Sequence, residues 1–151
     1  MEKKFWITLA VVDLLLVVFV AGLFMPVSCK HTDNKAHIDV VQMFEHFDEN
    51  EHSEYYFDET TDTPAALAIT TSTKKFNAEM TSGVAHHDWA CQTTFKTCYT
   101  FDFVENEDYT IIVTPPTGYT YTNNIIKFNS NEFKNKAYKG KTIVLSFSKI
   151  K

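Results

Sequence analysis

The chain has 151 residues, a net charge of −5 and 14 lysines, with no arginine among its basic residues. This balance disfavours nucleic-acid binding, because the two-pronged guanidinium of arginine is the usual contact to base edges. With four glycines in all, loops that cradle phosphate through their backbone are nearly excluded. The sequence also has no nucleophile elbow and no zincin motif. We therefore expect a non-catalytic protein without a cofactor, not an enzyme.

Residues 1–28 have the pattern of a signal or transmembrane segment. Lys3 and Lys4 precede an apolar run from Phe5 to Val27, which is long enough to cross a hydrocarbon core of about 30 Å as a helix. Asp13 lies inside this run, where a carboxylate costs a retained helix about 2.5–3.5 kcal/mol. Because the lysines hold the N-terminus in the cytoplasm, we expect a membrane-anchored, extracytoplasmic protein of the cell envelope or cell surface.

The end of this segment resembles the lipid-attachment box of bacterial lipoproteins, in which a cysteine becomes the lipidated N-terminus. Ser28 fits the small-residue position before Cys29, whereas Pro26 stands where leucine is usual. The resemblance implies lipidation of Cys29. A retained transmembrane anchor and a freely secreted product are the alternatives. The apolar run around Asp13 also resembles a type IV pilin helix, but the Gly-Phe processing site of pilins is missing.

Residues 29–63 are expected to form an acidic helical spacer. From His31 to Asp62 there are ten carboxylates and one lysine, a composition typical of a solvated segment. Apolar residues recur there at helical spacing: Ile38, Val41, Phe44 and Phe47. This spacing predicts one short amphipathic helix over residues 35–56.

After Pro64 the apolar residues recur at every second position, which predicts a β-sandwich domain over residues 64–151. Ser82-Gly83 is expected to form a turn, and Asn123-Asn124 the loop of a hairpin. The clearest strands are expected at residues 66–71, 76–80, 109–114 and 142–150. Seven or so short strands at this spacing are typical of a β-sandwich.

Cys91 and Cys98 are expected to form a disulfide bond. If Cys29 carries lipid, these two cysteines remain and are free to pair in an oxidising compartment. In one straight strand they would lie about 23 Å apart, whereas a disulfide needs Cα atoms within about 7 Å of each other. The bond therefore requires the chain to reverse around Thr93–Lys96. Otherwise both cysteines are free or pair elsewhere.

Residues 99–119 combine an aromatic strand, a second strand that begins at Tyr109, and a Pro-Thr-Gly-Tyr turn that ends at Tyr119. This stretch resembles the core of B-type repeats in Gram-positive collagen adhesins and related prealbumin-like domains. The resemblance implies a Greek-key β-sandwich that acts as a structural or stalk module in surface proteins. Many such repeats carry a Lys–Asn isopeptide bond. We expect none here, because residues 142–150 contain no asparagine.

Two groups of residues are candidate sites. His86 and His87, followed by Cys91, are the candidate metal ligands, although no second ligand group lies at a diagnostic spacing; a polar loop rich in histidine is the favoured alternative. Tyr119 and Tyr121 follow two prolines and are expected to offer an aromatic binding surface. One of these two tyrosines is expected to face into the sandwich instead.

These observations predict a mainly β protein, with a hydrophobic N-terminal helix and one short amphipathic helix before the sandwich. Its expected function is that of a membrane-tethered, extracytoplasmic binding or assembly module with a protein partner. One alternative is a retained single-pass subunit of a larger membrane complex, in which Asp13 pairs inside the bilayer. A histidine-dependent metal-binding protein is the other.

Overall fold

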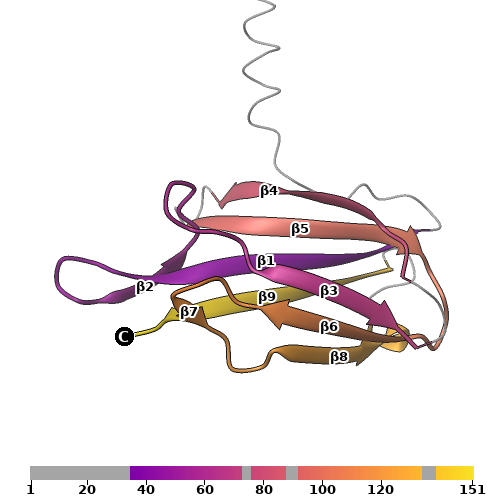
Figure 1. Ribbon diagram of the computed structural model, residues 1–151. Helices are drawn as coiled ribbons and strands as arrows, with labels where there is room; N and C mark the ends of the chain where they lie inside the picture. Colours follow the sequence, from indigo (N-terminus) through magenta and orange to yellow (C-terminus); the bar gives the residue numbers. More distant parts are fainter. Residues whose placement is uncertain (1–34, 73–75, 88–91, 134–138) are drawn as a thin grey trace, which may run out of the picture.

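The computed structural model describes residues 35–72, 76–87, 92–133 and 139–151, and it shows a mainly β fold of two sheets (Figure 1). The larger sheet has the strand order β4-β5-β1-β9-β7, and β2 pairs with the end of β1. The smaller sheet has the order β3-β6-β8. The strands are β1 (Lys35–Phe47), β2 (Ser53–Tyr56), β3 (Ala66–Thr71), β4 (Glu79–His87), β5 (Gln92–Asp102), β6 (Asp108–Thr114), β7 (Tyr119–Thr120), β8 (Ile125–Asn129) and β9 (Lys139–Lys149), and a 3₁₀ turn, η1, covers Ser130–Glu132.

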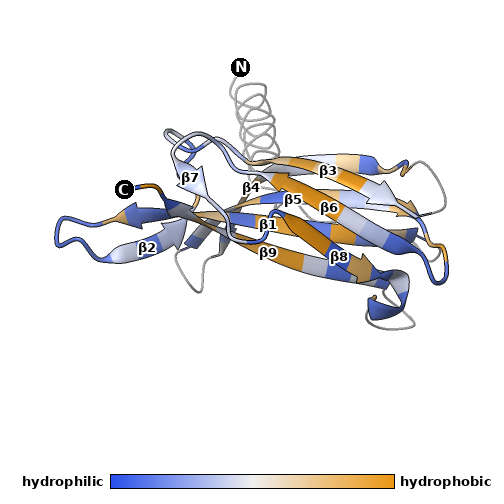
Figure 2. Ribbon diagram, turned by 60° about the horizontal axis from the view of Figure 1, so that its bottom comes forward, coloured by the Kyte–Doolittle hydropathy of each residue, from blue (hydrophilic) through white to orange (hydrophobic). Residues whose placement is uncertain are grey.

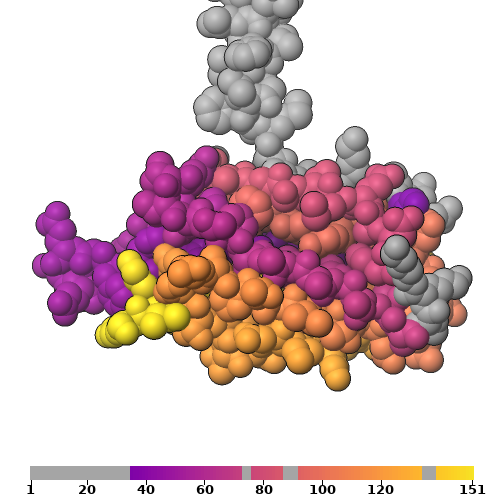
Figure 3. Space-filling model, in the orientation of Figure 1, coloured from indigo at the N-terminus to yellow at the C-terminus, as the bar shows by residue number. Residues whose placement is uncertain are grey.

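The helix predicted over residues 35–56 is wrong, because this segment forms β1 and β2. The two strands pair in antiparallel fashion and project beyond the rest of the sheet as a hairpin (Figures 1 and 3). β1 lies between β5 and β9, and residues 36–40 are all buried. Apolar and polar residues alternate from Ala36 to Val40, but Val41 and Met43 interrupt this alternation in the second half of the strand. Its apolar residues therefore also matched the spacing of a helix.

The core lies between the two sheets, and both sheets contribute buried apolar residues to it. Figure 2 shows hydrophobic residues along strands of both sheets. Alternate residues of each strand point to the same face, so the core-facing side chains follow a period of two. The largest fully buried apolar ones are Tyr109, Phe44, Phe147, Ile38, Ile111, Leu145, Val40 and Val113. Because β1 supplies three of these residues, the core includes residues that precede position 64.

Among the predicted strands, those at 66–71, 109–114 and 142–150 are confirmed by β3, β6 and β9. Ser82-Gly83 is not a turn, since both residues lie inside β4. The hairpin predicted at Asn123-Asn124 is also wrong, because β7 pairs with β9 and β8 pairs with β6. Tertiary pairing has overridden the local turn preference of the two asparagines.

The strand orders support a β-sandwich-like, mainly β fold, but they do not support its Greek-key form. A Greek key needs three consecutive hairpin-connected strands, with a fourth that returns beside the first. In the larger sheet only β4 and β5 are consecutive neighbours along the main path, and β1 pairs in parallel with β9, near the other end of the described chain.

Residues 1–34 lie outside the described residues, and with them the predicted hydrophobic N-terminal helix and Cys29. Within the described ranges, no helix has both the length and the apolar character needed to cross a membrane.

Candidate functional site

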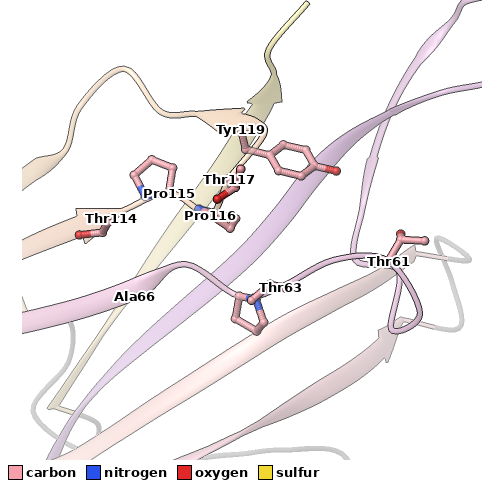
Figure 4. A pocket seen from close by; sticks show the side chains of 9 residues that line it. Thr61, Thr63, Ala66, Thr114, Pro115, Pro116, Thr117 and Tyr119 are labelled. Atoms are coloured by element: carbon pink, nitrogen blue, oxygen red, sulfur yellow. The ribbon is translucent and has the colours of Figure 1, made fainter.

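A cavity of about 360 Å³ opens where β3 begins and β6 ends (Figure 4). The segment that leads into β3 forms one wall, and the turn after β6 forms the other. The described lining residues are four threonines (Thr61, Thr63, Thr114 and Thr117), three prolines (Pro64, Pro115 and Pro116), Ala66 and Tyr119. None of these nine side chains carries a charge.

A buried carboxylate holds the two walls together. The side chain of Asp62 is 1% exposed and lies between the lining residues Thr61 and Thr63 in the sequence. Its Oδ1 accepts a hydrogen bond of 3.0 Å from the hydroxyl of Tyr119. Its Oδ2 lies 2.8 Å from Nε2 of His46 in β1 and accepts a 2.9 Å bond from the backbone N–H of Asp58. Asp62 thus ties β1, the β2–β3 connection and the β6–β7 turn to one another.

The connection between β2 and β3 is fixed at both of its ends. The backbone N–H of Phe57 donates to the carbonyl of Thr93 in β5 at 2.7 Å. The backbone N–H of Ala65 donates to Oε1 of Gln42, a buried side chain of β1, also at 2.7 Å. Because buried amide groups need such partners, these bonds set the path of the wall that carries Thr61 and Thr63.

The opposite wall is a tight turn. The backbone N–H of Tyr119 donates to the carbonyl of Pro116 at 3.1 Å, and Gly118 has a φ of +89°. A turn with positive φ at its third residue favours glycine there. The carbonyl of Gly118 also accepts a 2.9 Å bond from Ile150, which attaches the turn to the end of β9.

Tyr119 has an aromatic face and a committed hydroxyl. Its ring packs edge-on against Phe44, with 4.9 Å between the ring centroids. Burial, followed by the hydrogen bond to Asp62, raises the pKa of Tyr119 to about 12. The tyrosine therefore remains a hydrogen-bond donor over the whole neutral range, and the side of the ring that faces the cavity offers a neutral surface.

The carboxyl group of Asp58, beside this network, remains ionised at neutral pH. Hydrogen bonds from the Thr60 side chain and backbone lower the pKa of Asp58. Burial, and then the negative charge of Asp58, raise the pKa of Tyr56, whose ring stacks on His46 at 4.2 Å. None of the described residues that line the cavity is acidic.

The two tyrosines predicted as a binding surface occupy different positions. Tyr119 lines the cavity beside Pro115 and Pro116, whereas Tyr121 packs against Phe147 of the core at 5.4 Å and does not line the cavity. Both side chains are partly buried against the hydrophobic core.

His86, the member of the predicted histidine pair whose side chain the structure describes, does not line this cavity. Nδ1 of His86 lies 3.2 Å from the Thr93 hydroxyl, and its Nε2 lies 3.6 Å from Glu59, with both side chains more than half exposed. Across the described residues, no group of three or more histidine, cysteine or acidic side chains is arranged to hold a metal ion. The metal site at His86 and His87 therefore stays a prediction.

The structure describes one member of the predicted cysteine pair, Cys98. Cys98 is 1% exposed in the middle of β5, opposite Asp39 of β1 and Thr81 of β4. β5 runs without interruption through Gln92–Asp102 and so lacks the reversal around residues 93–96 that the Cys91–Cys98 bond was expected to require, although Cys98 itself is disulfide-bonded. Cys91, like Cys29, lies outside the described residues.

The sequence analysis missed His46 and Asp62, the two residues that hold the cavity together. Both belong to the segment interpreted as an acidic spacer, where the many carboxylates suggested full solvation. Asp62 is 57 positions away from Tyr119, its partner in the turn. Locally, the sequence offers only the polar residues just before Pro64. They indicate that a strand begins nearby, but not that the carboxylate among them is buried.

A second, smaller cavity of about 220 Å³ lies at the opposite end of the sandwich. It is lined partly by Phe76, Phe101 and Tyr109 and by the buried carboxylate of Glu107. The Ser72 hydroxyl donates to Glu107 at 3.2 Å. Residues 73–75, which follow Ser72, are outside the described part of the chain, so we treat the first cavity as the candidate binding site.

Comparisons with known proteins add no further assignment. No family model matches the chain, and neither a curated protein nor a solved structure matches it.

Proposed function

We propose that the protein is a membrane-tethered, extracytoplasmic binding module without catalytic activity. We propose further that it binds its ligand in the cavity whose two walls are linked by Asp62. The observation that carries this proposal is the contrast between the walls and the lining. The walls are fixed by a buried carboxylate with three hydrogen-bonding partners, while all nine described lining residues are uncharged.

The chemistry of the lining favours a neutral ligand that carries hydroxyl groups. Four threonine hydroxyls offer hydrogen bonds, and the proline rings with Tyr119 offer apolar surface. A charged ligand would lose part of its hydration without meeting an opposite charge, which is unfavourable. Neutral sugars combine hydroxyl groups with apolar C–H faces, and they fit this description. A pocket of this size is within the ordinary range for small-molecule sites.

The binding proposal is tested by calorimetry on the full-length protein in detergent micelles. The probes are a panel of neutral oligosaccharides and the same panel in sulfated form. We expect heat of binding with neutral members only. Thr114→Lys places a charge on the cavity wall and should abolish this signal, whereas Thr70→Lys, at another exposed threonine of the same sheet, should preserve it. No neutral binder, or equal loss in both variants, contradicts the proposal.

The membrane part of the proposal rests on the apolar run that ends only eight residues before β1 begins, between Val27 and Lys35. Intact-mass analysis of membrane-extracted protein tests it. Loss of the first 28 residues together with an added lipid mass supports lipidation of Cys29, and the full-length mass supports a retained anchor. Recovery of the native protein in the cytosol contradicts both forms of tether.

A retained single-pass subunit of a membrane complex is the second candidate function. Asp13 favours it, because a carboxylate inside an apolar helix needs a partner in the bilayer. In this case the full-length mass is found together with co-purifying membrane subunits, and Asp13→Leu releases them. The same variant leaves a lipoprotein unaffected once its signal has been removed.

The resemblance to prealbumin-like repeats remains a proposal about the body of the protein. The aromatic strand and the strand from Tyr109 that carry the resemblance correspond to β5 and β6, which belong to different sheets. The Pro-Thr-Gly-Tyr turn of the same stretch forms a wall of the cavity. A module of this kind supports a role as a binding or assembly component at a cell surface.

A further inference from the structure

Cys98 is the one described cysteine of the chain, and it is disulfide-bonded. The sequence has three cysteines, at positions 29, 91 and 98. Since the structure is that of a single chain, the partner of Cys98 is Cys29 or Cys91. Both of these lie outside the described residues, so the choice between them depends on the geometry of β5 and on the surroundings of Cys98.

The geometry of β5 excludes Cys91. β5 is continuous from Gln92 to Asp102, and its pairing with β4 includes Gln92 itself. Six strand residues at about 3.3 Å each place the Cα atoms of Gln92 and Cys98 about 20 Å apart. Because Cys91 is joined directly to Gln92, its Cα stays at least about 16 Å from that of Cys98. A disulfide requires Cα atoms within about 7 Å of each other.

Cys98 lies on the outer face of the larger sheet, away from the core. Phe95, Tyr99 and Phe101 of β5 pack in or against the core, and successive residues of a strand point to opposite faces. Cys98 therefore lies on the face that the smaller sheet does not cover. Its side chain is nevertheless buried, with 1% of the residue exposed.

The patch around Cys98 is buried, whereas the same face is open farther along the sheet. On β1, Asp39 lies opposite Cys98 and is 6% exposed, and His37 is 2% exposed. Lys96, which lies 3.0 Å from Asp39, covers part of the patch. On β9, Val144 belongs to the same face and is 54% exposed. Because the described strands all belong to the two sheets, this local burial indicates that a further segment of the chain covers β1 and β5.

Cys29 is within reach of this patch. It precedes Lys35, the first residue of β1, by six positions, and six residues span up to about 20 Å. Lys35 pairs with Asp102, which is about 13 Å from Cys98 along β5. A segment that turns back from Lys35 over the outer face is therefore long enough to bring Cys29 to Cys98.

We infer that Cys29 and Cys98 form a disulfide bond, which ties the segment before β1 to the outer face of the larger sheet. The bond forms when the two thiols give up two protons and two electrons to the disulfide of a thiol–disulfide oxidoreductase, which is thereby reduced to a dithiol. The inference rests on the extracytoplasmic location in the proposed function, because such bonds form and persist in oxidising compartments.

This bond also selects the form of the membrane tether. The sulfur of a disulfide cannot at the same time carry the thioether of a lipoprotein, so Cys29 is not the lipid attachment point. The tether is then the retained apolar run, which ends at Val27, two residues before the bonded cysteine. The sandwich is joined to this run both at the start of β1 and at the middle of β5.

The test is peptide mapping of the full-length protein by mass spectrometry, without reduction. Free thiols are blocked with N-ethylmaleimide during extraction from the membrane. Because the chain has no arginine, trypsin cuts after lysines only, and its cut after Lys96 separates Cys91 from Cys98. We expect residues 5–30 linked to residues 97–127, and a blocked thiol at Cys91.

The other outcomes of the mapping are distinct. A link from residues 97–127 to residues 76–96, a blocked thiol at Cys98 or a lipid on Cys29 overturns the inference. A bond between Cys29 and Cys98 in a chain that has lost residues 1–28 supports the disulfide. That last result contradicts the membrane tether of the proposed function, so the two failures can be told apart.

Thermal unfolding with and without a reductant gives a second check. Reduction removes a cross-link between positions 29 and 98 and should lower the Tm of the unmodified protein by at least about 6 °C. Cys91→Ser is the matched control and should keep this fall. Cys29→Ser should abolish it, because no bond remains to reduce. A fall that persists in Cys29→Ser, or that disappears in Cys91→Ser, contradicts the inference.

Discussion

Tyr109 and Tyr119 are at opposite ends of the sandwich, and burial raises the pKa of each to about 12. Tyr109 is 2% exposed and stacks on Phe128 at 5.3 Å, within a cluster of aromatic rings. Tyr119 packs against Phe44 but directs its hydroxyl to the carboxylate of Asp62. The same residue type thus fills the core at one end and links two cavity walls at the other.

Because of this difference, we expect the Tyr109 end to serve mainly the stability of the fold and the Tyr119 end to serve ligand binding as well. At the Tyr109 end, the side chain contributes to stability mainly through its ring, which contacts Phe76, Phe101 and Phe133. At the Tyr119 end, part of the contribution to stability comes from the hydrogen bond between the Tyr119 hydroxyl and the Asp62 carboxylate. These polar groups are turned away from the cavity and leave its lining neutral. Changes to rings and changes to polar groups should therefore have different effects at the two ends.

The largest effect is expected from Tyr109→Ala. Removing a fully buried ring between the two sheets should lower the free energy of unfolding by about 3–5 kcal/mol, because the transfer energy and the cavity cost add. Urea denaturation followed by tryptophan or tyrosine fluorescence measures it. A loss under about 1 kcal/mol would show that Tyr109 is not a central packing residue.

The next largest effect is expected from Asp62→Ala. This variant leaves the Tyr119 hydroxyl, His46 and the Asp58 N–H without their acceptor, and each such buried group costs about 1–3 kcal/mol. We expect a loss of about 3 kcal/mol in unfolding free energy together with loss of ligand binding. Glu59→Ala is the control, because its side chain is 57% exposed and its loss should change stability by less than about 0.5 kcal/mol.

Comparison of the two ends also explains which parts were predictable from the sequence. Strands with one covered face, such as β6 and β9, alternate in polarity, and this pattern located them within one to three residues. β1 alternates only as far as Val40, and its apolar residues from Ile38 to Phe47 also recur at helical spacing, so it was mistaken for a helix. Tyr119 was identified from its neighbouring prolines. Asp62 was not, because its burial depends on partners from β1 and the distant turn.

Another effect is expected from alkaline pH. Since the pKa of Tyr109 and of Tyr119 lies near 12 in the folded state and near 10 in the unfolded state, the unfolded chain loses these protons first. The resulting contribution to stability is complete below about pH 10 and is lost as the pH rises towards 12. Urea midpoints measured from about pH 8 to 11.5 should fall. The fall should be shallower in Tyr119→Phe, and an unchanged slope would contradict the pKa assignment of Tyr119.

The smallest effect, and the sharpest comparison, comes from Tyr119→Phe and Tyr109→Phe. The first variant keeps the ring against Phe44 but removes the donor to Asp62, so it should cost about 1 kcal/mol. The second should cost less, because the Tyr109 hydroxyl makes no hydrogen bond within the described residues. For a domain of this size, 1 kcal/mol corresponds to a fall of about 3–6 °C in Tm, which calorimetry resolves. Equal Tm values for the two variants would mean that the Tyr119–Asp62 bond contributes nothing to holding the walls, and that the cavity is fixed by the backbone alone.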